Sequence, residues 1–454
     1  MKYTIIVKIM LQRIKFIIKQ LLYDLRTGLL FRPLVITAFY VILEIILVTV
    51  EQHNLINLSW AKWLPCGFEG EPATAQTVLG TIAGSIITVT SIVYSMLAMA
   101  LSLSSVQFSP RILSSFMEDT TCQNVLGVFI GTFTYCLLLL RTIHGEPDLF
   151  VPQISVSTAI LMALICMGCL IYFIDHMSKY IQVNYIYEHI ARETELVIDS
   201  VFPEKARGEE KQEYTQVPSE DIVSVLSNKS GYIQLIDDER LTWAAKEYGI
   251  KIFCKIPVGD FTVQGTPILY VSPQKKVTEK IKNICISAFD TGTVRTFQQD
   301  ISLGIRQMVD IALKAISPAV NDPTTAVTCI DHLGRVLIRM AQRHIAPWEI
   351  KDPLTGKLLV SLRRISFKEI LDLSFTQLRQ YGKTDMAVSL RLMKIIKDIA
   401  MITSNKAYHK ELYSHASLIE EGTKDNFSDR ERLELFEIKE EIKKITGDFI
   451  YKTE

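Results

Sequence analysis

The chain has 454 residues, of which 48% are hydrophobic and 22% are charged. Its mean hydropathy of +0.22 is high for a water-soluble protein, so the composition indicates membrane-spanning helices together with a soluble portion. The 49 basic residues balance the 49 acidic ones, which argues against the basic surface that nucleic-acid binding needs.

Four apolar runs are each near or above the roughly 20 residues that cross a hydrocarbon core. They lie at about 33–50, 77–105, 124–143 and 154–176. The first run begins too far from the start of the chain for a cleavable signal peptide, so we expect it to remain as an anchor. The sequence therefore predicts an α-helical membrane protein with four transmembrane helices, whose membrane domain covers 33–178.

Charged residues beside the runs indicate how the chain is oriented. The segment 1–32 carries seven Lys and Arg residues against one acid, Asp24, and such a basic flank stays in the cytoplasm. Because its bases alternate with apolar side chains at helical intervals, this amphipathic segment either lies along the inner leaflet or simply extends the first span. The loops 51–76 and 144–153 are acidic and suit the outer face. With four spans, we expect both termini to be cytoplasmic.

Small residues follow one face of the second run. Alternating steps of three and four residues keep them on one side of a helix. We call this set the small-residue seam: Thr81, Gly84, Thr88, Ser91, Ser95, Ala98, Ser102, Ser105 and Ser109.

Two interpretations of the seam are open. In the structural one, small residues let membrane helices pack closely. In the functional one, copies of this helix surround a wet path, and the hydroxyls are weak, uncharged ligands for ions. A four-span subunit is too small to enclose such a path, so the functional interpretation requires a homo-oligomer.

Two charged residues lie inside the apolar runs. Glu44 is about two turns from the outer end of the first run, where a lone carboxylate is costly. Arg141 lies near the outer end of the third run at a similar depth by counting, so we predict an ion pair between Glu44 and Arg141. At the inner end of the fourth run, Asp175 and His176 indicate a polar interface rather than a proton relay, and one histidine predicts no metal site.

Eight cysteines are spread along the chain, without the double pairs that are typical of a zinc site. Cys166 and Cys169 have the spacing of a CxxC motif, but they lie inside an apolar run. We interpret them as small buried residues. The sequence thus predicts no disulfide framework, no metal and no cofactor.

The residues after the fourth run predict a mixed α+β, mainly helical cytoplasmic domain. A stalk helix and a polar linker occupy 179–221. In 222–272, three strand-like segments around a short helix indicate a small α+β or β-barrel-like unit. The remainder, 273–454, has helical periodicity, and Asn321 or Asp322 is suited to cap a helix there.

The helical part carries a group of polar residues dense enough to bind an anion or to form a contact between subunits. Its members are Arg295, Asp300, Arg306, Asp310, Asn321 and Asp322. The sequence has no P-loop, HExxH, GxSxG or GxGxxG motif. A salt-bridged polar interface is therefore the favoured interpretation, and we expect no enzyme activity.

Three segments are similar to a known family: LGTIAGSIITVTSIVYSMLAMALSLSSVQFSPRIL, SGYIQLID and RTFQQDISLGIRQMVDIALKAISPAVNDPTTA. Together they resemble a bacterial family of predicted membrane proteins of unknown function, domain family 2254. The resemblance extends from about residue 25 to about residue 400. It implies a multi-pass protein of the bacterial inner membrane, and it supplies no catalytic residues.

The sequence as a whole predicts an oligomeric inner-membrane protein whose partners are the lipid bilayer and further copies of itself. The favoured function is passive conduction of ions or small solutes along a path lined by the second span and gated by the cytoplasmic domain. The alternative is a non-conducting scaffold or sensor whose cytoplasmic domain binds a ligand or a protein. Neither function involves nucleic acid.

Overall fold

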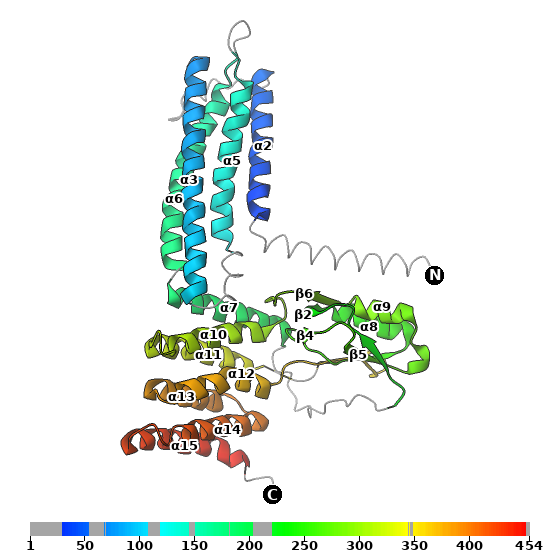
Figure 1. Ribbon diagram of the computed structural model, residues 1–454. Coiled ribbons are helices and arrows are strands. Elements are labelled where there is room, and N and C mark those ends of the chain that lie inside the picture. The colour runs from blue at the N-terminus through cyan, green and yellow to red at the C-terminus, as the bar shows by residue number, and fades with distance from the viewer. Residues whose placement is uncertain are drawn as a thin grey trace. The chain divides into compact units, whose positions relative to one another are not determined.

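The computed structural model describes residues 30–53, 68, 70–107, 119–144, 150–180, 182–202, 220–343, 345 and 348–450. The chain divides into two compact units, Met1–Gln182 and Val183–Glu454, which we call unit 1 and unit 2. Unit 1 is a helical bundle, and unit 2 combines helices with two β-sheets (Figure 1).

Unit 1 contains the four apolar helices that hydropathy predicts. They are α2 (Phe31–Gln52), α3 (Pro72–Gln107), α5 (Thr120–Thr142) and α6 (Gln153–Tyr180). Each is long and apolar enough to cross a membrane. The prediction of four apolar helices is therefore confirmed.

The central helix of unit 1 is α5. Half of its apolar window is buried, against 17%, 22% and 28% of the windows in α2, α3 and α6. Two glycines of α5 let α2 approach closely: a Cβ at Gly127 would lie 3.0 Å from the Pro33 backbone, and one at Gly131 would lie 3.0 Å from the Tyr40 ring. The contact on α2 moves forward from Pro33 to Tyr40 as the contact on α5 moves forward from Gly127 to Gly131. The two helices therefore run parallel, and Tyr40 is level with Gly131.

Unit 2 contains a five-stranded sheet in the order β1-β5-β3-β8-β7 and a three-stranded sheet in the order β4-β2-β6. In the larger sheet β3 and β8 pair in parallel, with Ile252 opposite Val360, and the other neighbours are antiparallel. The strands are β1 (Val223–Leu226), β2 (Gly231–Ile236), β3 (Lys251–Cys254), β4 (Phe261–Thr262), β5 (Pro267–Ser272), β6 (Phe289–Gly292), β7 (Trp348–Lys351) and β8 (Leu358–Leu362).

Two helices, α8 (Asp238–Tyr248) and α9 (Glu279–Ile286), pack their apolar sides against the larger sheet. A single 3₁₀ turn, η3 (Gln274–Lys276), lies between β5 and α9. The strands β6, β7 and β8 come from residues after 272, so the small unit expected at 222–272 is completed by later segments. These strands are only four or five residues long, and they therefore leave little period-two signal in a region whose pattern is mostly helical.

The remaining helices of unit 2 form successive layers (Figure 1). The segment expected as a stalk and linker contributes the first of them, which packs against the next two within unit 2. The expected helix start is confirmed, because Asp322 caps the third helix of this group and Pro323 occupies its first turn. In order they are α7 (Val183–Val201), α10 (Ile301–Ala315), α11 (Pro323–Ala341), α12 (Phe367–Gly382), α13 (Met386–Ile402), α14 (Lys406–Gly422) and α15 (Asp429–Ile450).

Candidate functional site

The small-residue seam lies on the surface of α3. The structure describes the side chains of its members from Thr81 to Ser102, and every one of them is exposed. The side chains of Ser105 and Ser109 lie outside the described residues. The packing of unit 1 therefore leaves the described part of the seam uncovered.

The opposite side of α3 is the one that packs in the bundle. It buries Leu79 and Leu97 together with other apolar side chains. Thr88 is nine residues from each of these two leucines, which is two and a half helical turns. The seam and the buried side are therefore about 180° apart on the helix.

Four hydroxyl groups of the seam donate hydrogen bonds to their own helix. The hydroxyl of Thr88 donates to the carbonyl of Gly84 at 2.9 Å, and that of Ser95 donates to the carbonyl of Ser91 at 2.8 Å. Thr81 and Ser91 make the same bond one turn back. The hydroxyl protons of these four residues are thereby satisfied, and their oxygens remain uncharged acceptors on the helix surface.

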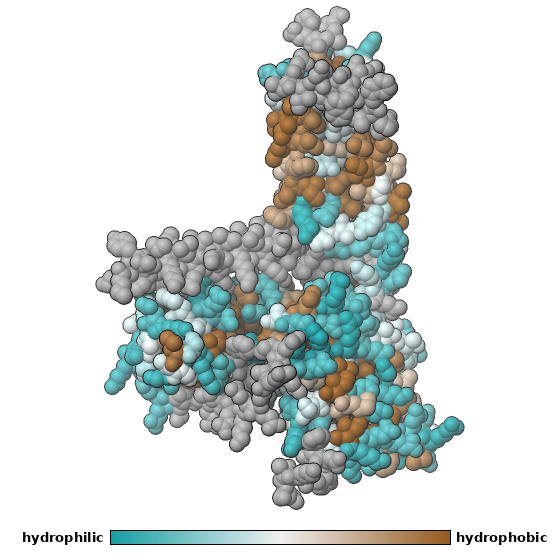
Figure 2. Space-filling view, turned by 180° about the vertical axis from the view of Figure 1, so that it is seen from behind, coloured by the Kyte–Doolittle hydropathy of each residue, from teal (hydrophilic) through white to brown (hydrophobic). Residues whose placement is uncertain are grey.

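Large apolar side chains flank the seam. On α3 itself, Ile92, Tyr94 and Met99 are between 52% and 64% exposed. The bundle surface is largely hydrophobic and the surface of unit 2 is largely hydrophilic on the face shown in Figure 2. A surface of this kind suits contact with lipid, and within it the seam is a line of small, weakly polar groups. Further exposed apolar residues on α2 and α6 are Leu34, Phe39, Ile42, Ile45, Leu161, Leu164, Ile165, Met167 and Ile171.

The predicted ion pair between Glu44 and Arg141 is not formed. Glu44 is buried, with 4% of its surface exposed, whereas Arg141 is exposed in the last turn of α5. The parallel packing of α2 and α5 explains the difference. Because Tyr40 is level with Gly131, Glu44 is level with Tyr135. Arg141 lies six residues farther along α5, or about 9 Å, so the depth inferred by counting is wrong.

A different acid of α2, Glu51, makes a bond between helices. Its carboxylate accepts hydrogen bonds from the backbone amides of Ile154 at 2.7 Å and Ser155 at 3.0 Å, and also from the Ser155 hydroxyl. Glu51 thus caps the first turn of α6 from a neighbouring helix. From the sequence Glu51 belongs to the outer loop. The sequence signal for this role is Pro152, which stands before α6 at the position where many helices have a Ser, Thr, Asp or Asn. Because the proline has no capping side chain, the first amides of α6 need an acceptor from elsewhere.

In unit 2, Arg295 and Asp300 of the predicted polar interface form a buried ion pair. The guanidinium donates to both carboxylate oxygens, at 2.6 and 2.7 Å, and Asp300 is 2% exposed. The same carboxylate caps α10 by accepting a bond from the amide of Leu303. Burial raises the pKa of Asp300, and the Arg295 guanidinium opposes this rise. Gly259 lies against the carboxylate at a φ of +92°, and a Cβ there would clash with it.

The other members of the predicted interface make separate contacts. Arg306 donates to the side-chain oxygen of Gln377 at 3.0 Å and so links α10 to α12. Asp322 caps α11, and Asn321 adopts a φ of 50° in the turn before it. Asp310 is half-buried on α10. Arg306 therefore joins two helices and Asp322 caps one, whereas Arg295 and Asp300 form an ion pair.

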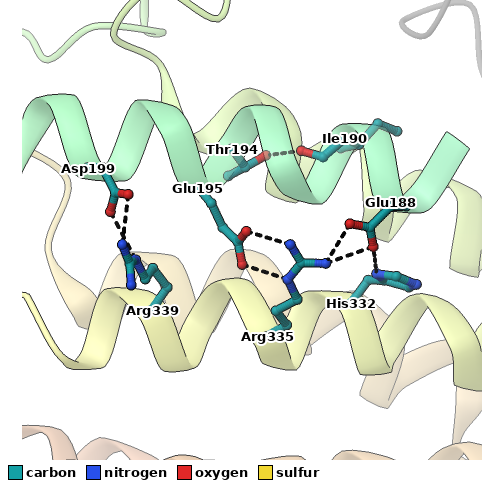
Figure 3. Close-up of polar contacts among 8 residues, drawn as sticks. All are labelled: Glu188, Ile190, Thr194, Glu195, Asp199, His332, Arg335 and Arg339. Atoms are coloured by element: carbon teal, nitrogen blue, oxygen red, sulfur yellow. Dashed lines mark hydrogen bonds and ion pairs between the residues drawn. The ribbon is translucent and has the colours of Figure 1, made fainter. Parts of the chain in front are cut away.

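A row of ion pairs joins α7 to α11 within unit 2 (Figure 3). Arg335 lies between Glu188 and Glu195 and bonds each at 2.7 Å. Farther along, Asp199 accepts bonds from Arg339. Arg335 holds the pKa of Glu188 below its usual range, and Arg339 does the same for Asp199. The sequence signal for this row is a set of acidic residues on one helix and of basic residues on another, each set at helical spacing. The sequence alone does not reveal the row, because nothing in it indicates that these two helices are neighbours.

A family model described as predicted membrane protein (DUF2254) matches residues 26–398. Two similar proteins are uncharacterized proteins of Mycobacterium tuberculosis and Mycobacterium bovis. Each is 30% identical to this chain over 372 residues, which is 80% of this chain and 70% of the relative. No solved structure matches the chain. The matched range includes the four apolar helices of unit 1 and most of unit 2.

Proposed function

Because this chain belongs to the DUF2254 family of predicted membrane proteins, we propose that it forms a homo-oligomer in which copies of α3 surround a passive path for ions or small solutes. The observation that carries the proposal is the small-residue seam, which lies on the side of α3 that its own bundle leaves exposed. In this proposal unit 2 gates the path.

The helix α3 is long enough for the seam to line a path across the whole membrane. Its 36 residues span about 54 Å, which exceeds the roughly 30 Å of a hydrocarbon core. The described seam from Thr81 to Ser102 alone rises about 32 Å. One copy presents the seam on one side only, so a closed path needs several copies around an axis.

The chemistry of the seam supports conduction without tight binding. The back-bonded hydroxyls leave oxygen atoms that accept hydrogen bonds or contact a cation weakly. The seam contains no charged residue. A ring of such helices would therefore let an ion enter without holding it.

A non-conducting scaffold or sensor is the second candidate, and one observation favours it. The hydroxyls of Thr88 and Ser95 already donate within α3, and a Cβ added at Gly84 would meet no atom within 4 Å. Two copies could therefore pack along the seam without water between them. Unit 2 would then carry the function by binding a ligand or a protein.

The proposal includes an orientation in a bacterial inner membrane. The basic segment 1–32 favours the cytoplasmic side. Four crossings return the chain to the side on which it starts, so unit 2 and both termini are cytoplasmic in this proposal. It assigns the chain no catalytic chemistry, no cofactor and no nucleic-acid partner.

Conductance of the full-length protein in a planar bilayer tests the proposal. Ser95→Leu and Ser102→Leu should each abolish conductance, because bulky apolar side chains narrow and dewet a hydroxyl-lined path. Ser85→Leu is the matched control, since Ser85 is exposed on the same helix but lies about 80° from Ser95 and about 100° from Ser102 around the helix axis. This variant should conduct as the wild type does.

Oligomeric state and conductance together separate the two candidates. An oligomer in mild detergent that shows no conductance would replace the channel with the scaffold or sensor. A protein that is monomeric in mild detergent and in bilayers would contradict the channel. Equal loss of conductance in Ser85→Leu and Ser95→Leu would show that the seam has no special role.

A further inference from the structure

Four side chains with metal-ligating atoms meet where α5 begins and α6 ends. They are Asp119, Cys122, His176 and Met177. The Asp119 carboxylate is 2.9 Å from Nε2 of His176, and the ligand atoms of Asp119, Cys122 and His176 all lie within 4.8 Å of one another. Sδ of Met177 lies 3.7 Å from Sγ of Cys122. In the sequence His176 is isolated, and the fold brings it to an acid 57 residues earlier.

The local structure holds these groups in place. One oxygen of Asp119 accepts a bond from the Cys122 amide at 2.9 Å as the N-cap of α5, so the other oxygen faces His176. The His176 ring stacks on Tyr172 of its own helix, with centroids 6.2 Å apart. Cys122 is 1% exposed, while the side chains of Asp119 and His176 are 8% and 14% exposed. The cluster is therefore largely sheltered, while Asp119 and His176 keep a small exposed surface.

We propose that Asp119, Cys122 and His176 bind one Zn²⁺ ion. A carboxylate oxygen, an imidazole nitrogen and a thiolate sulfur are all preferred zinc ligands. In a tetrahedral site with usual bond lengths the ligand atoms are roughly 3.3 to 3.6 Å apart, which small side-chain rotations reach from the observed separations. Binding converts the Cys122 thiol to the thiolate and releases its proton to solvent. Water completes the coordination.

The choice of Zn²⁺ over Cu⁺ follows from the ligand set. Cu⁺ prefers soft sulfur ligands, and a site for it would use Cys122, His176 and Met177 and leave the Asp119 carboxylate outside. The observed geometry places that carboxylate against the imidazole instead. Met177 then shields the cluster as an apolar neighbour.

A hydrogen bond between Asp119 and His176 alone would hold the two helices together without any metal. In that account the Cys122 thiol lies close to the Asp119 carboxylate and the His176 ring only because the helices pack there, and it has no role of its own. Under the proposal the ion ties the first turn of α5 to the last turns of α6, immediately before the chain passes to unit 2. The inference does not depend on conduction, so it stands or fails apart from the proposed function.

Metal binding to the full-length protein in detergent tests the site. After chelation and dialysis, the wild type should take up one Zn²⁺ per chain, measured by elemental analysis. Co²⁺ in its place should show a thiolate-to-cobalt charge-transfer absorption, which Cys122→Ser should abolish. His176→Gln and Asp119→Asn, the latter still able to cap α5, should each weaken Zn²⁺ binding by at least the roughly 10- to 100-fold that loss of an outer-shell partner costs.

The matched control is Cys169→Ser, because Cys169 is a half-buried cysteine of α6 that lies outside the cluster. This variant should bind Zn²⁺ as the wild type does and should keep the charge-transfer absorption. Circular dichroism and size-exclusion elution of every variant establish that the fold is retained. Zn²⁺ uptake by the wild type no greater than by Cys122→Ser would overturn the proposal, and so would retention of Cu⁺ without Zn²⁺.

Discussion

Glu51 and Ser155 join two helices of the bundle: the Glu51 carboxylate at the end of α2 accepts bonds from both the backbone amide and the hydroxyl of Ser155 at the start of α6. The first amides of a helix have no partner within it. Here the Glu51 carboxylate of α2 is the acceptor for two of the first amides of α6, those of Ile154 and Ser155. The contact thus links segments about 100 residues apart.

Glu51→Ala should lower the stability of the bundle by about 1–3 kcal/mol, because it leaves the amides of Ile154 and Ser155 without their acceptor. Thermal unfolding of the detergent-solubilised protein measures the change. Glu71→Ala is the control, since Glu71 is exposed just before α3 and its loss should have little effect. Similar unfolding temperatures for the two variants would argue against a capping role for Glu51.

Gly127→Ala should destabilise unit 1 by about 1–3 kcal/mol through overpacking. Its Cβ would lie 2.7 Å from the Ile36 side chain and 3.0 Å from the Pro33 backbone, so α2 must move away. Gly168→Ala is the matched change in an apolar helix, at a position outside the seam with open space, and it should leave the unfolding temperature unchanged or raise it slightly. Circular dichroism during heating compares the two, and the prediction fails if Gly168→Ala is the more damaging.

Arg295→Ala should destabilise unit 2 by about 3–5 kcal/mol at pH 7, because it leaves the buried Asp300 carboxylate without its cation. Burial already raises the folded pKa of Asp300 above its ordinary value of 3.8, and the variant raises it further. A raised carboxyl pKa costs stability as the pH rises from the unfolded pKa through the folded pKa. The deficit of the variant should therefore be largest at neutral pH and should shrink as the pH falls toward 3.8.

Thermal unfolding of wild type and Arg295→Ala at pH 7 and pH 5 measures this dependence. The double variant Arg295→Ala with Asp300→Asn should recover part of the loss at pH 7, because Asn carries no charge and still caps a helix. A deficit that is the same at both pH values, with no recovery in the double variant, would show that the charge on Asp300 does not matter.

Hydropathy alone predicts the four helices of unit 1, since length and apolar composition are local properties of the sequence. The cap of α11 is also local: the sequence predicts Asn321 or Asp322, and the structure has Asp322. Pairing between helices is not local. The Glu44 to Arg141 prediction fails because the register of α2 on α5 depends on close approach at Gly127 and Gly131, which counting from the ends of the runs does not reveal.

The same limit applies to the sites. The row at Arg335 and the cluster at His176 each combine residues from two helices, so neither has a motif within one segment. The seam is the opposite case, because its members lie on one helix and periodicity alone defines them. The structure adds which way the described part of it faces.

The parallel packing of α2 on α5 has a consequence for how the protein is made. The chain emerges from the ribosome with α2 first, yet the glycine surface that receives α2 belongs to the third apolar helix. Until α5 has been synthesised, Glu44 has no helix to cover it. We therefore expect the bundle to assemble only after the third hydrophobic segment has been synthesised.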